Sequence, residues 1–302
     1  MLADQEIRLA AKKIGLVFAI ALAAVAFTGL ANAQQQPPPL SVKPLTGGVY
    51  WTQGGAGGNT GIIVGKDGVI VIDAKTTPAS AKEMLAEIAK ITPKPVTTVI
   101  LTHSDGDHVN GLAAFPAGLT IISQESCKKE MEASASSRNP APQDRLPNKT
   151  VANKENLTIN GVKLNLLHYA PAHTSGDLMV YLPEQKIVFT GDIITTNQPY
   201  TLIHAEKNGS SEGWIQTVKG LTSLNADSYV PGHGDLQTKA DVQQRLAKVQ
   251  ARHEEIKKLV AQGKSLDQVK QALGETDTPA APGAPQFPSY TTVVYNELTK
   301  KS

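Results

Sequence analysis

The sequence predicts a layered α/β sandwich, because short apolar runs that suit buried strands alternate along the chain with segments of helical periodicity. The clearest unit joins the continuous apolar run 69–73 to a helix expected over residues 78–91, where Met84 and Ile88 recur at helical spacing. Another apolar run follows at 97–101, so strand, helix and strand repeat in order.

Upstream of this unit, two further strands are expected at residues 48–51 and 60–64. They are joined by the glycine-rich segment 53–59. Two interpretations of this segment stay open: a mobile flap over a binding site, with Tyr50 or Trp51 stacking on an apolar ligand, or a plain turn beside two core aromatic residues.

Downstream, alternating apolar residues over 162–166 predict a half-buried strand, and runs at 178–182 and 187–189 predict two more around a tight turn. A long amphipathic helix is expected over residues 239–261. The segment 134–148 is rich in Ser, Pro, Asn and Gln, which indicates a mobile surface loop.

The front of the chain has the pattern of a secretory signal peptide over residues 1–33. Basic residues precede an apolar run, 14–30, and the small residues Ala31-Asn32-Ala33 provide a cleavage site. The alternative is a single membrane anchor, since the run approaches spanning length. We expect cleavage after Sec export into the periplasm or medium. A Gln/Pro-rich tether is expected over 34–45, and one large α/β domain with C-terminal helices over 46–302.

Composition narrows the classes of function. The 29 Lys and Arg residues nearly balance the 27 Asp and Glu residues, so no footprint for nucleic acid or an anionic membrane is visible. A small-molecule substrate is expected, and the oligomeric state stays open. Cys127 is the single cysteine, which excludes an intramolecular disulfide and a thiolate-rich metal cluster. Any metal ligands must therefore be histidines or carboxylates.

The run 102–108, directly after the apolar segment 97–101, is the strongest functional signal. It concentrates four side chains able to bind metal ions: His103, Asp105, Asp107 and His108. Alternate residues on a tight loop can point into one cavity, and imidazole nitrogen and carboxylate oxygen suit divalent ions. Alone, such a turn is often merely solvated.

Three later residues complete the pattern. His173, Asp192 and His233 each lie beside a glycine-containing turn that follows or ends an apolar run. Strand ends are rigid and their loops are exposed, so several of them can converge on one ion. Together with the first cluster, they predict a two-metal centre.

In this order the motifs resemble those of the metallo-β-lactamase-fold hydrolases. The resemblance covers nearly the whole mature chain: the strand ending at Asp73, the His103 to His108 run, His173, Thr190-Gly191-Asp192 and Pro231-Gly232-His233-Gly234. It implies a four-layer αβ/βα sandwich, and it is much less specific for the substrate.

The resemblance also implies roles for individual residues. The first ion would be held by His103, Asp105 and His173. The second ion would be held by Asp107, His108 and His233. Asp192 matches the bridging carboxylate of the glyoxalase II and lactonase-like branches, and Asp73 matches an early aspartate that supports the site without binding metal. Asp105 replaces the family's usual second histidine, so the two divalent ions expected as zinc can also be iron or manganese.

The implied activity is that of an exported metal-dependent hydrolase, in which a metal-bound hydroxide cleaves an ester, lactone, thioester or lactam carbonyl. Asp107 would orient that hydroxide and carry its proton to the leaving group. Two alternatives stay open: a true metallo-β-lactamase that hydrolyses β-lactam antibiotics, and a non-catalytic metal-binding relative. Specificity is expected to lie in the variable loops 134–148 and 197–210.

Several reactive residue types are given simpler interpretations. We expect His168 to be packed or exposed without a ligand role, and His253 to be a core histidine on the last long helix. His204 is a weak candidate for a pocket wall. Cys127 is expected to be a semi-buried thiol, because no motif pairs it with a base.

Overall fold

The computed structural model describes residues 37–137, 139–275 and 287–300. The predicted signal peptide over residues 1–33 lies outside these described residues. Every helix and strand described belongs to the compact unit Pro39–Ser302. Within the described ranges, no helix is both long and apolar enough to cross a bilayer.

The first sheet has seven strands that follow chain order, with antiparallel pairing from β1 to β4 and parallel pairing from β4 to β7. Its strands are β1 (Ser41–Pro44), β2 (Val49–Gln53), β3 (Thr60–Val64), β4 (Val69–Ile72), β5 (Val96–Ile100), β6 (Thr120–Gln124) and β7 (Lys149–Val151). The strand β1 lies inside the predicted tether 34–45, so the ordered domain begins before residue 46. The strand β1 was not predicted, because it is a short edge strand with one apolar residue, Val42.

The second sheet has six strands in the order β13, β12, β11, β10, β9, β8. They are β8 (Lys154–Ile159), β9 (Val162–Leu167), β10 (Met179–Leu182), β11 (Ile187–Thr195), β12 (Ser228–His233) and β13 (Gln237–Thr238). Only the β11–β12 pair is parallel among them, and its register shifts on both sides of Gly191. This irregularity lies next to Asp192.

The α-helices are α2 (Pro78–Ile91), α3 (Gly106–Val109), α4 (Glu125–Ala133), α5 (Ser211–Ser223), α6 (Lys239–Ala261), α7 (Leu266–Ala272) and α8 (Tyr290–Thr299). Short 3₁₀ turns are η1 (Asn110–Ala114), η2 (Ser134–Ser136), η3 (Gln143–Arg145) and η4 (Ala205–Lys207). The helices predicted at 78–91 and 239–261 are confirmed. The predicted loop 134–148 contains η2 and η3, and its last residue, Asn148, is hydrogen-bonded to the backbone of Leu119 and Ile121.

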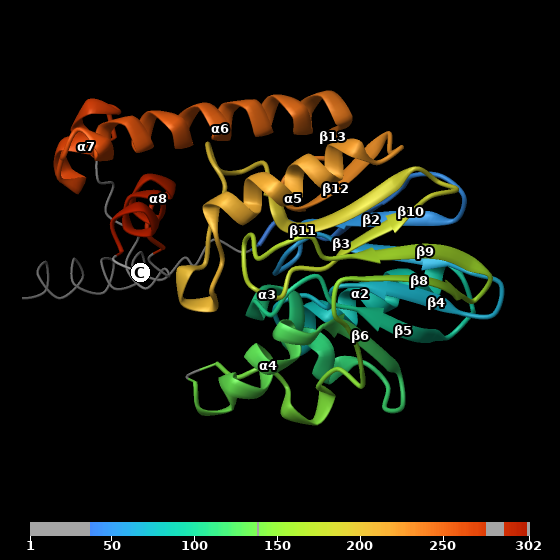
Figure 1. The fold of residues 1–302 in the computed structure, drawn as a ribbon. Coiled ribbons are helices and arrows are strands. Elements are labelled where there is room, and N and C mark those ends of the chain that lie inside the picture. Colours follow the sequence, from blue (N-terminus) through green and yellow to red (C-terminus); the bar gives the residue numbers. More distant parts are fainter. Residues whose placement is uncertain (1–36, 138, 276–286, 301–302) are drawn as a thin grey trace, which may run out of the picture. The chain divides into compact units, whose positions relative to one another are not determined.

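Three apolar clusters divide the domain into four layers. The strand β4 is buried on both faces: Val69 and Val71 pack in one cluster with Met84 of α2, whereas Ile70 and Ile72 pack between the sheets. The third cluster joins the outer face of the second sheet to α5, α6 and α8. Helices therefore cover both outer faces, with α5 and α6 beside β11 and β12, and α4 beside β6 (Figure 1). The predicted αβ/βα sandwich is confirmed.

Candidate metal centre

The seven candidate ligands come together from four segments of the chain. His103 follows β5, and Asp105 is the N-cap of the short helix α3 that carries Asp107 and His108. The other three are His173 in the β9–β10 connection, Asp192 in the irregular part of β11, and His233 at the end of β12. Each of the seven belongs to at least one of three groups whose ligand atoms lie within 4.8 Å of one another, and Asp192 contacts His108 and His233 of the third group. The structure thus brings every predicted site residue to one place.

Hydrogen bonds on the outer edge orient three of the imidazole rings. His108 Nδ1 donates to Asp73 Oδ2 at 2.8 Å, and His173 Nδ1 donates to the Leu202 carbonyl at 2.9 Å. His103 Nδ1 lies 2.9 Å from the hydroxyl of Thr102, which itself donates to Asp73. These partners fix the tautomer in which Nε2 carries the lone pair, as metal-binding histidines require. Asp73 supports the centre from behind, as predicted.

One group of donors consists of Asp107, His108 and His233. Nε2 of His233 lies 3.0 Å from Asp107 Oδ2 and 3.4 Å from Nε2 of His108. Nε2 of His108 lies 3.6 Å from the same carboxylate oxygen of Asp107. Three atoms at these separations can bind one small cation.

The second group consists of His103, His173 and Asp192, with Asp105 beside it. Asp105 Oδ2 lies 3.1 Å from His173 Nε2 and 3.7 Å from His103 Nε2. The side chain of His204 joins Asp105 and His173 in a further triad on the far side. This group is deeply buried, and its donors are of the same chemical types as the first.

Asp192 lies between the two groups. Its Oδ1 is 3.3 Å from His108 Nε2, whereas its Oδ2 is 3.5 Å from His233 Nε2 and 3.9 Å from His173 Nε2. One carboxylate therefore faces donors from both groups. That is the position the resemblance implied for a shared ligand.

The charges of the centre are strongly coupled. Burial lowers the pKa of His108, but the carboxylates of Asp107, Asp192 and Asp73 outweigh this and raise it well above its usual value. Burial likewise opposes protonation of His173, yet its hydrogen bond to Asp105 raises its pKa to about 9. Protons on these rings therefore balance the carboxylates in the absence of cations, and divalent ions would displace them.

Two buried atoms show that the residues fit such ions. Neither His103 Nε2 nor Asp192 Oδ1 makes a well-formed hydrogen bond among the described residues, although Asp192 Oδ1 lies 3.3 Å from His108 Nε2. Burial, together with the neighbouring His108, also holds the pKa of His103 well below its usual value, so the ring is neutral. Buried polar atoms without partners cost about 1–3 kcal/mol each. Cations ligated by imidazole and carboxylate would satisfy both atoms, and this donor set suits zinc, iron or manganese.

The glycine-rich segment 53–59 is fastened to the centre. The backbone N–H groups of Gly58 and Asn59 donate to the carbonyls of Asp107 and Gly232, and the Asn59 amide donates to the Pro231 carbonyl. A Cβ on Gly58 would overlap the His108 ring, so no other residue fits there without displacing it. The structure favours an anchored loop over a flap, and Trp51 is a core residue.

Lys75 is a supporting residue that the sequence did not reveal. Its side chain is fully buried, and Nζ donates at 2.9 Å to the carbonyls of both Gly54 and Gly58. Burial lowers its pKa to about 8. Its backbone lies in the left-handed region, with φ of 69°. Nothing in the sequence distinguishes Lys75 from a surface lysine. Lys75 ties the glycine-rich segment to the strand end that carries Asp73.

Lys207 was also missed by sequence reasoning, and His204 was only a weak candidate. Lys207 Nζ lies 2.6 Å from Asp105 Oδ1, and His204 Nδ1 lies 3.5 Å from the same oxygen. Both residues follow β11 in a segment without periodicity, about 100 positions after Asp105. A lysine spaced three residues from a histidine was the available signal, and it is too common to be specific.

The simpler interpretations of other residues are largely confirmed. His168 Nδ1 contacts the Asp177 carbonyl and His253 is buried on α6, and neither belongs to a donor group found among the described residues. The expectation of a semi-buried Cys127 is wrong, because the thiol is fully buried beneath the first sheet and its pKa is raised by that burial.

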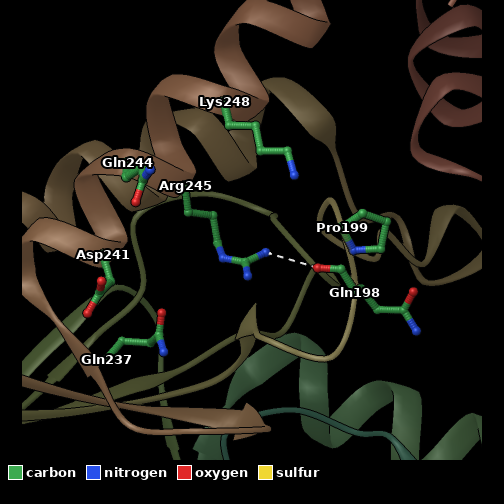
Figure 2. A pocket seen from close by; sticks show the side chains of 7 residues that line it. All are labelled: Gln198, Pro199, Gln237, Asp241, Gln244, Arg245 and Lys248. Atoms are coloured by element: carbon green, nitrogen blue, oxygen red, sulfur yellow. Dashed lines mark hydrogen bonds between the residues drawn. The ribbon is translucent and has the colours of Figure 1, made fainter.

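An open polar pocket of about 460 Å³ lies between α6 and the segment after β11 (Figure 2). Gln198 and Pro199 form one wall, and Arg245 and Lys248 project from α6 on the other. None of the candidate metal ligands lines it. Gln198 and Pro199 belong to the 197–210 loop that was expected to govern specificity.

The chain is similar to a known protein family and to several known proteins. A family model described as the metallo-beta-lactamase superfamily matches residues 54–233, a range that contains all seven candidate ligands. The chain is 28% identical over 197 residues to the alpha subunit of 2,4-dinitroanisole O-demethylase from Nocardioides sp. (strain JS1661), covering 65% of this chain and 58% of that protein. It is 23% identical over 216 residues to a linear primary-alkylsulfatase from Pseudomonas sp. (strain ATCC 19151), covering 57% of this chain and 40% of that protein.

Among solved structures, a metallo-beta-lactamase from Pontibacter korlensis has a TM-score of 0.61 at 21% identity, covering 70% of this chain and 99% of that one. Likeness at this identity shows the fold alone. The chain spans about half the length of the two curated relatives it matches. Both relatives are named for small-molecule substrates.

Proposed function

Because the chain belongs to the metallo-beta-lactamase superfamily, whose members are mostly hydrolases, we propose that it is a divalent-metal-dependent hydrolase. The observation that carries the proposal is the pair of donor groups that share Asp192, with unpartnered buried ligand atoms between them. A chain that retained the fold without binding metal ions would have no need to keep these atoms unpaired.

We infer that the first ion is held by His103, Asp105 and His173, and the second by Asp107, His108 and His233. Asp192 faces both sets. When bound, two such ions supply an activated water at neutral pH and polarise the bond under attack. Zinc is the expected ion, and the extra carboxylate at Asp105 also permits iron or manganese.

Asp107 is the residue best placed to act on the substrate. Its side chain is 35% exposed, compared with 6% for Asp192 and 11% for Asp105. Its contact with His233 holds one oxygen, Oδ2, toward the centre. A carboxylate that is anchored at the centre yet open to solvent can orient the attacking water, take its proton and deliver it to the leaving group.

The substrate we propose is an ester, lactone, thioester or lactam. The two curated relatives act on other bonds, a methyl aryl ether and an alkyl sulfate by their names. The superfamily name adds the β-lactam ring. Fold similarity does not distinguish among these substrates, so the activity assay must include all of them.

The test starts from protein purified without chelators or nickel affinity resin, with metal content measured by mass spectrometry. Rates are then measured on a thioester, a lactone, a p-nitrophenyl ester, a chromogenic cephalosporin, 2,4-dinitroanisole and dodecyl sulfate. We expect two ions per chain and turnover of a carbonyl ester or lactone. Preferred turnover of the cephalosporin would identify a β-lactamase, and two bound ions with no turnover would identify a non-catalytic relative.

Two variants test the roles of named residues. Asp107→Asn is expected to abolish turnover while the fold and the first ion are retained, and His173→Ala to abolish turnover through loss of the first ion. His253→Ala is the matched control, since it removes a buried histidine that lies outside the donor groups of the described chain. Activity retained in both purified active-site variants would refute the assignment.

Export is a separate proposal. We propose that residues 1–33 direct the chain to the periplasm and are removed before Gln34. Fractionation followed by mass determination of the mature N-terminus tests it. A full-length chain that stays with the membrane would show an uncleaved anchor.

A further inference from the structure

His204 is buried beside the centre, yet its ring has no hydrogen-bond partner among the described residues. The residue is 6% exposed, and neither Nδ1 nor Nε2 makes a hydrogen bond, although carboxylate oxygens of Asp105 and Glu206 lie 3.5 Å and 3.8 Å from Nδ1. The rings of His173 and Phe287 pack against it, with centroids 4.9 Å and 4.5 Å away. An imidazole that is buried without partners is unfavourable, which indicates that one of its nitrogens serves something else.

The geometry around His204 points to a cation. His204, Asp105 and His173 present ligand atoms that all lie within 4.8 Å of one another. Ligand atoms sit about 2.0–2.2 Å from a bound zinc ion, so a pair on opposite sides of it is separated by about 4 Å. Small side-chain rotations would therefore close this triad around one ion.

The loop that carries His204 is fastened to the same residues. The His204 N–H donates to the His173 carbonyl at 2.8 Å, and the Ser175 N–H donates to the Lys207 carbonyl at 2.8 Å. A Cβ on Gly209 would collide with the His173 carbonyl, which shows how closely the two backbones approach. The backbone of His204 is thus held beside His173 before any ion binds, so only side-chain rotation is needed, and preorganisation of this kind favours binding.

Lys207 binds one of the two carboxylate oxygens of Asp105. Its Nζ contacts Oδ1 at 2.6 Å and the Ser104 hydroxyl at 3.0 Å. This contact leaves Oδ2 directed at His173 and His103. The ammonium also balances a carboxylate charge that would otherwise be buried beside Asp192.

We propose that His204 is an additional ligand of the first metal ion, and that Lys207 is a positioning residue that holds Asp105 for the same ion. The inference rests on the proposed metal centre, but it concerns ion binding and not the reaction. The first ion would then be held from the buried side by a loop that the motif 102–108 does not contain.

The test compares His204→Ala with His253→Ala in zinc titrations against a chromophoric chelator, with stoichiometry confirmed by mass spectrometry. We expect His253→Ala to bind two ions like the wild type. We expect His204→Ala to keep one ion at wild-type affinity and to bind the other at least 10-fold more weakly. Lys207→Met is expected to weaken the same ion by about 10-fold, as loss of a ligand's supporting partner does.

A second variant keeps the proposal testable if the alanine protein folds poorly. His204→Cys loaded with Co²⁺ should show a thiolate-to-cobalt charge-transfer band in the near ultraviolet. His253→Cys and the wild type, with its buried Cys127, should show none.

The outcomes separate this proposal from the proposed function. Two ions at unchanged affinity in His204→Ala, and no band in His204→Cys, would overturn the role of His204 and leave the hydrolase proposal intact. Wild-type protein that binds no ion would overturn both. Two ions and the expected band, without turnover of any substrate, would support the ligand and count against the hydrolase.

Discussion

Replacing Asp73 with asparagine tests how the hydrogen bond to the His108 ring contributes to metal binding, because it leaves every candidate metal ligand unchanged. Asp73 accepts three hydrogen bonds: from the Thr102 N–H at 2.8 Å, the Thr102 hydroxyl at 2.7 Å and His108 Nδ1 at 2.8 Å. Its backbone lies in the left-handed region with φ of 64°, which asparagine tolerates better than most residues. The substitution therefore changes the chemistry of one oxygen and leaves the strand end in place.

The amide oxygen of the variant can keep the bond from the Thr102 N–H, so the NH₂ group replaces Oδ2. That group would face His108 Nδ1 donor to donor, and the ring would respond by moving its proton to Nε2. Nε2 points at Asp192 and His233, where the lone pair is needed. A hydrogen bond to a charged group contributes about 1.5–3 kcal/mol, which corresponds to about 10- to 150-fold in binding. We expect the second ion to bind about 10- to 100-fold more weakly.

Zinc titration of the apoprotein against a chromophoric chelator measures this loss, with circular dichroism as the check on folding. Asp227→Asn is the charge-matched control, because Asp227 is a 72% exposed partner of Lys186. An Asp73→Asn protein that folds and binds both ions within twofold of wild type would refute the view that Asp73 sets the tautomer of His108.

Three further outcomes are expected. Gly58→Ala places a Cβ 2.5 Å from His108 Nε2 and should destabilise the apoprotein by about 1–3 kcal/mol in chemical denaturation; unchanged stability would contradict overlap with the ring. His173 must lose its proton to bind metal, so zinc affinity should rise from pH 6 toward its pKa of about 9, with proton release seen by calorimetry in two buffers; pH-independent affinity would contradict this. Trp214→Phe leaves the Ile193 carbonyl without its donor and should cost about 1–3 kcal/mol of unfolding free energy, whereas a neutral result would mean that water replaces the indole.

The parts of the centre that could be predicted are those tied to strand periodicity. His103 and His233 stand where apolar runs end, and the parallel strands β4 and β5 bring Asp73 next to Thr102. Because the ends of adjacent parallel strands meet at one edge of a sheet, the approach of Asp73 to the run 102–108 could be expected. His233 ends β12 in the second sheet, so its approach to His103 was implied by the order of the motifs and not by strand pairing. The two long helices were predictable for the same reason, since their apolar faces repeat every three to four residues.

The unpredicted parts depend on contacts between segments without periodicity. Lys75 reads as an ordinary surface residue, and only the tertiary structure reveals that it fills the space beneath the glycine-rich segment. The meeting of Lys207 with Asp105 depends on the path of the loop after β11, which no spacing in the sequence determines. Lys75 binds backbone carbonyls, and Lys207 binds a carboxylate that is already buried. Their roles can be recognised only when these partners are known.

The two sides of the centre differ in exposure to solvent, and this difference suggests a separate role for each side. Asp107 and His233 have side chains 35% and 27% exposed, whereas His103, His173 and Asp105 are 1%, 0% and 11% exposed. A substrate can therefore approach along the Asp107 and His233 edge, while the Asp105 side is closed by the His204 to Lys207 segment. In the proposed hydrolase, the carboxylate of Asp105 would therefore affect which ion is held and how tightly, and Asp107 would affect how the substrate is attacked.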